Sequence, residues 1–163
     1  MERQWSDPEE LARRLGPAVF RLAYARTGSR TDAEDIMQEV FLRLLRARPT
    51  FSDEEHAKAW LLRVAANCAN DLFRAPWRKR EEPLSEGLSA PQEPEHGGVV
   101  EAVLALPPKY RAAVHLYYYE ELSVEEIAAI LGKRPGTIKS RLYRARTQMR
   151  RFLMEEDQDA QRL

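Results

Sequence analysis

The residues best suited to bind another molecule are eight lysines and arginines between Lys133 and Arg151, a stretch without aspartate or glutamate. Apolar residues recur through the same stretch at helical spacing, from Ile138 to Phe152, and predict a helix with a core-facing stripe. The basic residues then lie outside that stripe. Helix faces that only meet solvent usually mix both signs of charge, so a purely basic face favours nucleic-acid binding.

A shorter helix and a tight turn precede this basic helix. Ser123 and Glu126 have the spacing of a capping box, which begins the short helix, and Gly132 is placed to end it. Pro135 suits the start of the next helix because its missing N–H would be unpaired there. This order predicts a helix-turn-helix that binds the major groove of duplex DNA.

The charge of the whole chain hides this property. The 163 residues include 26 Lys and Arg and 26 Asp and Glu, so the formal net charge is zero. The distribution is uneven, because residues 81–108 contain acidic residues and no Lys or Arg, and residues 155–163 are acidic again. Basic residues cluster before and after the first acidic segment.

Cysteine usage and hydropathy exclude several classes of protein. Cys68 is the single cysteine, so no intrachain disulfide forms, and we expect it to be a small core residue. The three histidines lack ligand-like spacing, and we expect neither a metal site nor a cofactor. No apolar run approaches the roughly 20 residues that span a bilayer, and the first residues do not form a signal peptide. We expect a soluble, cytoplasmic protein.

Helical periodicity recurs through the chain, whereas strand patterns are absent. The first expected helix begins at Asp7 and ends near Gly28, with a break at Gly16-Pro17. Thr31 or Asp32 is expected to cap the second helix, in which Leu44 and Leu45 both pack inward. The third helix spans about 54–74, with one stripe of core residues from Ala57 to Leu72. The fold class is therefore all-α, with two small helical domains at 1–78 and 98–154, an acidic flexible linker at 79–97 and an acidic tail at 155–163.

Three segments outside the basic helix also carry polar or charged residues at positions that suit binding. The second helix is acidic at its start and basic at its end, an order that the helix dipole alone would explain. The third helix places Arg63, Asn67, Asp71 and Arg74 opposite its apolar stripe; asparagine often reads base edges, although a hydrogen-bonded surface asparagine is commoner. Trp77 and the basic residues after it suit single-stranded nucleic acid.

Four motifs, in this order and spacing, make the chain resemble an extracytoplasmic-function sigma factor of the sigma-70 family, which keeps only domains 2 and 4. The motifs are DAEDIMQEVF at 32–41, AWLLRVAANCANDLFR at 59–74, LPPKYRAAVHLYYYEELSVEEIAAIL at 106–131 and GTIKSRLYRAR at 136–146. The resemblance implies an N-terminal sigma-2 bundle and a C-terminal sigma-4 helix-turn-helix.

The resemblance also implies three sets of site residues. The set expected to contact the β′ clamp helices of core RNA polymerase is Asp32, Asp35, Gln38, Glu39 and Phe41. The set expected to melt and read the −10 element is Phe51, Arg63, Asn67, Asp71, Arg74, Trp77, Arg78 and Lys79, with Phe51 in polar surroundings on a loop that captures a flipped base. The set expected to read the −35 duplex is Arg134, Thr137, Lys139, Ser140, Arg141, Tyr143, Arg144 and Thr147.

The expected partners follow from the same resemblance. They are core RNA polymerase, at its β′ clamp helices and β flap, promoter DNA, and an anti-sigma factor that can hold the chain at the membrane; we expect no small-molecule substrate and no membrane insertion. The acidic linker is either a mimic of RNA in a basic channel or a solvated tether.

Two other classes of function compete with this interpretation. An autonomous helix-turn-helix regulator would bind a palindromic duplex without polymerase, but it needs neither the acidic face at 32–39 nor the cluster at Trp77. An enzyme is not supported, because the sequence shows no Ser/His/Asp set, glycine-rich phosphate loop or metal cluster.

Overall fold

The structure is a computed structural model that describes residues 7–74 and 102–162, with side chains as far as Glu155. Every regular element within these ranges is helical, which confirms the all-α prediction. The predicted linker at 79–97 lies outside the described residues. None of the helices in the described part of the chain combines the length and apolarity needed to cross a membrane.

The N-terminal module consists of α1 (Pro8–Thr27), α2 (Arg30–Ala47) and α3 (Glu54–Arg74), which pack against one another. The predicted break at Gly16-Pro17 is wrong, because α1 continues through it. Pro17 faces solvent, where water can satisfy the carbonyl that loses its partner. Leu15 and Val19, on either side of the proline, are buried in the core and keep both halves of the helix packed against it.

The predicted cap of α2 is also wrong. Ser29, not Thr31 or Asp32, occupies the cap position, with an extended backbone and a side chain that accepts a hydrogen bond from Asp32 N at 3.2 Å. Gly28, at φ 69°, ends α1 in the left-handed conformation. The chain therefore turns immediately before Ser29, which is the first residue able to cap the next helix.

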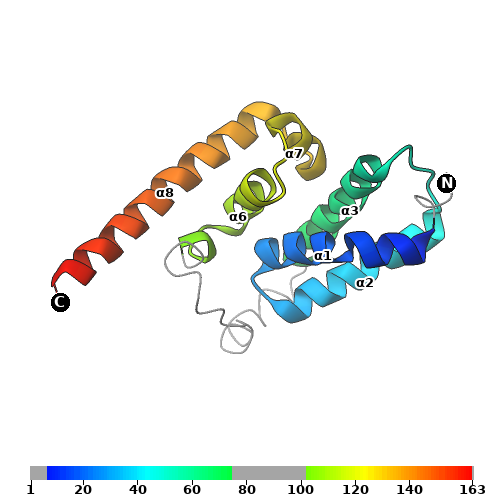
Figure 1. The fold of residues 1–163 in the computed structure, drawn as a ribbon, viewed down its shortest axis with the longest axis horizontal. Helices are drawn as coiled ribbons and strands as arrows, with labels where there is room; N and C mark the ends of the chain where they lie inside the picture. Colours follow the sequence, from blue (N-terminus) through cyan, green and yellow to red (C-terminus); the bar gives the residue numbers. More distant parts are fainter. Residues whose placement is uncertain (1–6, 75–101, 163) are drawn as a thin grey trace.

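The C-terminal module contains α6 (Pro108–Val114), a π-helical turn (His115–Tyr119), α7 (Val124–Leu131) and α8 (Pro135–Arg162). The capping box is confirmed: Ser123 N donates to Glu126 Oε1 at 2.9 Å, and Glu126 N donates to Ser123 Oγ at 3.1 Å. Gly132 has φ 67° and ends α7, as predicted. Helix α8 extends away from the three-helix bundle and continues through most of the predicted acidic tail (Figure 1).

The two modules pack against each other, with α6 beside α1 and α7 beside α3 (Figure 1). This contact buries a second side of α3 that the single predicted stripe did not include. Leu62, Ala66 and Ala69 on that side are 1, 5 and 1% exposed. Ala66 and Ala69 lie near Ala112 and Leu131 of the C-terminal module, so α3 is enclosed from two directions.

We predict that Ser29→Ala lowers the free energy of unfolding by about 1 kcal/mol, because the substitution leaves a backbone N–H of α2 without its cap. Thr31→Ala, a change of similar size on the exposed first turn, should leave the stability nearly unchanged. Denaturant unfolding of both variants measures this difference. A larger loss in Thr31→Ala than in Ser29→Ala would contradict the assigned cap.

Candidate nucleic-acid interface

Helix α8 and the turn before it carry the predicted −35 set, most of which lies exposed, away from the buried stripe of α8. Ile138, Leu142 and Ala145 are at most 2% exposed and fix the rotation of the helix. Tyr143, in contrast, is 69% exposed, although an aromatic ring is usually at least half-buried in a folded domain. The members of the predicted set that lie exposed with it are Arg134, Lys139, Ser140 and Arg144.

Three members of that set are half-buried and not fully exposed. Thr147 donates its hydroxyl to Tyr143 O at 3.1 Å and is therefore satisfied within its own helix. Thr137 lies in the first turn of α8. Arg141 faces the N-terminal module, where burial lowers its pKa. The structure thus divides the predicted set into exposed residues, two half-buried threonines of α8, and Arg141, which faces the N-terminal module.

The predicted −10 residues Arg63, Asn67, Asp71 and Arg74 form one exposed strip along α3. Arg63 reaches the C-terminal module, where its Nη1 donates to the carbonyl of Ala129 on α7. The strip therefore borders the contact between the modules. Trp77, Arg78 and Lys79 lie outside the described residues.

Phe51 does not have the polar surroundings expected from the sequence. It is 4% exposed, and its ring packs edge-on against His56 and Trp60, with ring centroids 5.2 and 5.8 Å away. Two nearby aromatic residues in the following helix provide this environment. In this structure Phe51 anchors the loop to the core, and its role toward a flipped base stays a prediction.

Helix α2 exposes the predicted polymerase-binding residues Asp35 and Gln38. Glu39 pairs with Arg43, at 2.9 Å between Oε2 and Nε, while Phe41 packs partly against the core. Asp32 is half-buried at the start of the same helix.

Sequence reasoning missed two exposed leucines on α2. Leu42 is 45% exposed, and Leu45 is 51% exposed although it was expected to pack inward. Leu44 takes the core position, and its neighbour Leu45 necessarily points about 100° away from it. Asp35, Gln38, Leu42 and Leu45 are spaced 3, 4 and 3 residues apart, which is the heptad spacing that coiled coils use and the signal that would have identified them.

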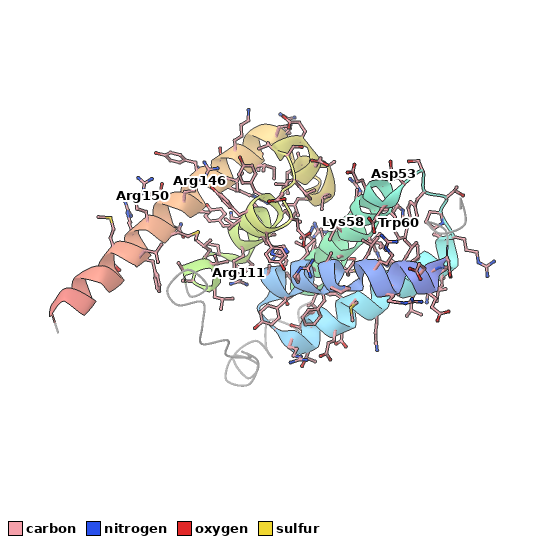
Figure 2. The ribbon with its side chains drawn as sticks, viewed as in Figure 1. Asp53, Lys58, Trp60, Arg111, Arg146 and Arg150 are labelled. Carbon is pink, nitrogen blue, oxygen red and sulfur yellow. The ribbon has the colours of Figure 1, made fainter. Side chains whose placement is uncertain are left out.

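Arg111 of α6, labelled in Figure 2, donates hydrogen bonds to backbone carbonyls of both modules. Its Nε donates to Ala25 O at 2.6 Å and its Nη2 to Arg26 O at 3.3 Å, so it satisfies carbonyls in the last turn of α1. Its Nη1 donates to the carbonyls of Leu104 and Leu106 in its own module. Burial lowers the pKa of Arg111.

Glu120 forms a second connection between the modules. Its side chain is 4% exposed; Oε1 lies 2.8 Å from Lys58 Nζ, and Oε2 lies 3.2 Å from Arg21 Nη2 and 3.4 Å from His115 Nε2. Burial alone raises the pKa of Glu120, but the contacts with His115, Lys58 and Arg21 outweigh burial and lower the pKa to about 2. The carboxylate is therefore ionised at neutral pH.

A basic cavity of about 270 Å³ lies at the other edge of the contact, near the end of α3. Arg26 lies over the Phe73 ring, 4.3 Å from its centroid, and burial together with the charges of Arg111 and Arg141 lowers the pKa of Arg26 to about 10. None of the residues that line the cavity is acidic. Its basic lining residues are Arg26, Arg74, Lys109, Lys133 and Arg141.

Comparison with known proteins matches each module to a described protein family. A family described as Sigma-70 region 2 matches residues 11–79, and one described as Sigma-70, region 4 matches residues 97–149. The chain is 37% identical over 163 residues to the ECF RNA polymerase sigma factor SigE of Mycolicibacterium smegmatis, a match that covers 93% of this chain and 63% of that protein. It is 34% identical over 162 residues to the RNA polymerase sigma-E factor of Streptomyces coelicolor, covering 95 and 90%.

A solved structure has the same arrangement of elements. The sigma factor RpoE, in its complex with the anti-sigma factor NepR from Bartonella quintana, superimposes with a TM-score of 0.71 at 26% identity, covering 90% of this chain and 96% of that chain. Both modules, in the expected order, are thus similar to sigma factors along most of their length. The chain belongs to the extracytoplasmic-function group of the sigma-70 family, which are sigma factors of RNA polymerase and not enzymes.

Proposed function

We propose that this chain binds core RNA polymerase and directs it to promoters by reading a −35 duplex with α8 and melted −10 DNA with α3. The observation that carries the proposal is the exposed face of α8 from Lys139 to Arg144, which has positive charge without any acidic residue and an uncovered Tyr143. Such a face on the second helix of a helix-turn-helix suits the major groove.

The polymerase-binding surface in this proposal is the stripe of Asp35, Gln38, Leu42 and Leu45 on α2. Two exposed leucines in the C-terminal half of α2 favour a protein partner, and heptad spacing suits a partner that is itself a coiled coil. The clamp helices of the β′ subunit are the proposed partner. Glu39 takes a smaller part, because Arg43 already pairs with it.

Control by an anti-sigma factor in the cytoplasm completes the proposal. The relative RpoE was solved in complex with the anti-sigma factor NepR. The modules must separate for α3 and α8 to reach a promoter together, since Arg63 of α3 is bonded to α7 in the structure. A partner that holds the modules together would keep the chain inactive.

The exposed leucines also suit an autonomous dimeric regulator, which is the second candidate function. That regulator would bury Leu42 and Leu45 against a second copy and would bind a palindromic duplex without polymerase. The two functions differ in the oligomeric state of the free chain and in the need for polymerase.

We expect Arg144→Ala to weaken binding to the −35 duplex by about 1–3 kcal/mol and to relax specificity at one base pair, because arginine reads guanine edges in the major groove. Fluorescence anisotropy at fixed salt, with a pool of duplexes varied at each position, measures both effects. Arg150→Ala removes the same charge farther along α8 (Figure 2) and is the matched control. Equal losses, without a change in specificity, would indicate phosphate contact alone.

We expect Leu45→Glu to abolish retention of the chain by core RNA polymerase while the free energy of unfolding stays within about 0.5 kcal/mol, because Leu45 is exposed. A pull-down with purified core enzyme tests this. Met154→Glu, at an equally exposed apolar residue on α8, is the control and should be retained. Undiminished retention of Leu45→Glu would exclude the stripe as the polymerase-binding surface, and dimers of the free chain that dissociate in this variant would favour the autonomous regulator.

A further inference from the structure

The Glu120 carboxylate occupies a site whose positive charges come mainly from the other module. Arg21 on α1 donates from both Nε and Nη2 to Oε2, at 3.4 and 3.2 Å, and Lys58 on α3 lies 2.8 Å from Oε1. Each oxygen thus has its own cationic partner. The Arg21 guanidinium also lies over the Tyr119 ring, 4.9 Å from its centroid, which fixes its position.

The pair formed by Arg21 and Lys58 matches the needs of a phosphate as well as those of a carboxylate. Arginine and lysine donate to two oxygens of one anionic group in both cases. Among the residues that the structure describes, the only carboxylate paired with Arg21 or Lys58 is that of Glu120, which belongs to the C-terminal module. When the modules separate, both cations lose their anion.

This pair lies beside the strip of α3 that is proposed to bind −10 DNA. A cavity of about 520 Å³ between the modules is lined by Lys58, Trp60 and Arg63 of α3. Glu120, Glu121 and Glu126 of the C-terminal module line its opposite side. Lys58 lies on the part of α3 that approaches α7 (Figure 2). Three carboxylates of the C-terminal module therefore line the same cavity as Lys58 and Arg63 of α3, as nucleic-acid phosphates would, and Glu55 of α3 is the one acidic residue on the side of the N-terminal module.

We propose that Arg21 and Lys58 form a binding site for a backbone phosphate of promoter DNA, and that Glu120 fills this site while the modules are closed. The proposal rests on the proposed function of α3 in −10 binding. Separation of the modules frees Arg21, Lys58 and Arg63 together. Backbone phosphates of the DNA then replace the Glu120 carboxylate and the Ala129 carbonyl as their partners. Closure and DNA binding then exclude each other, because both use the same cations.

Salt dependence separates this proposal from a simpler one, in which Arg21 and Lys58 only hold the modules together. Glu120→Gln opens the chain and leaves both cations free for DNA, whereas Lys58→Gln opens it and removes one cation. We expect both variants of the full chain to show a larger radius of gyration in small-angle scattering. Only Glu120→Gln should bind a labelled single-stranded oligonucleotide of mixed sequence several-fold more tightly than wild type.

The decisive comparison uses the open Glu120→Gln chain as background. Adding Lys58→Gln should reduce the slope of log K against log salt by about 0.7, the change expected for one lost phosphate contact on single-stranded DNA. Adding Arg13→Gln, which removes an exposed charge elsewhere on α1, should leave the slope unchanged. Equal slopes with and without Lys58, or an unchanged radius and affinity in Glu120→Gln, would overturn the proposal.

A further variant distinguishes failure of this inference from failure of the proposed function. Asn67→Ala in the same background removes a polar group from the −10 strip without changing charge. If Asn67→Ala weakens binding while Lys58→Gln does not, α3 binds DNA and the phosphate site is wrong. If no variant with an open chain binds the oligonucleotide, the −10 function of α3 is wrong as well.

Discussion

The burial of α3 on two sides is the constraint on which the other features of this structure depend. Its apolar stripe closes the three-helix N-terminal module, and small residues such as Ala66 and Ala69 let the C-terminal module approach its second side closely. A polar strip from Arg63 to Arg74 stays exposed along the rest of α3, and Glu55, His56 and Ala59 are exposed near the start of the helix. The strip proposed to meet melted DNA therefore lies at the edge of the intermodule contact, where opening and closing change its surroundings.

Charges attract the two modules to each other at one edge of their contact and repel them at the other edge. At one edge Glu120 is ion-paired with Arg21 and Lys58, and its pKa falls to about 2. At the other edge the basic cavity gathers Arg26 and Arg141 without a carboxylate in its lining, and the pKa of Arg26 falls to about 10. The modules thus attract each other at one edge, whereas like charges face each other at the other edge. Such a contact suits the proposed opening of the modules on a polyanion.

Features set by local sequence were predictable, whereas those set by contact between modules were not. The capping box of α7 and the exposed face of α8 follow from spacing within a few turns. The burial of Ala66 and Ala69 depends on a module that begins more than 30 residues later, and a single helix shows only one stripe. The local sequence around Glu120 gives no sign of its ion pairs, because its partners Arg21 and Lys58 are distant in sequence. The prediction that Leu44 and Leu45 both pack inward is wrong for Leu45, because adjacent residues of a helix point about 100° apart and only Leu44 reaches the core.

The distance between the modules, measured by double electron–electron resonance, is the most direct test of a chain that closes on itself and opens to bind promoters. Spin labels would be attached at Arg13→Cys and Arg150→Cys, both exposed, in a Cys68→Ser background. We predict one narrow distance distribution in the free chain, and a longer distance once core RNA polymerase and promoter DNA are added. A broad distribution of long distances in the free chain, or a distance that polymerase and promoter leave unchanged, would contradict the closed arrangement and its release.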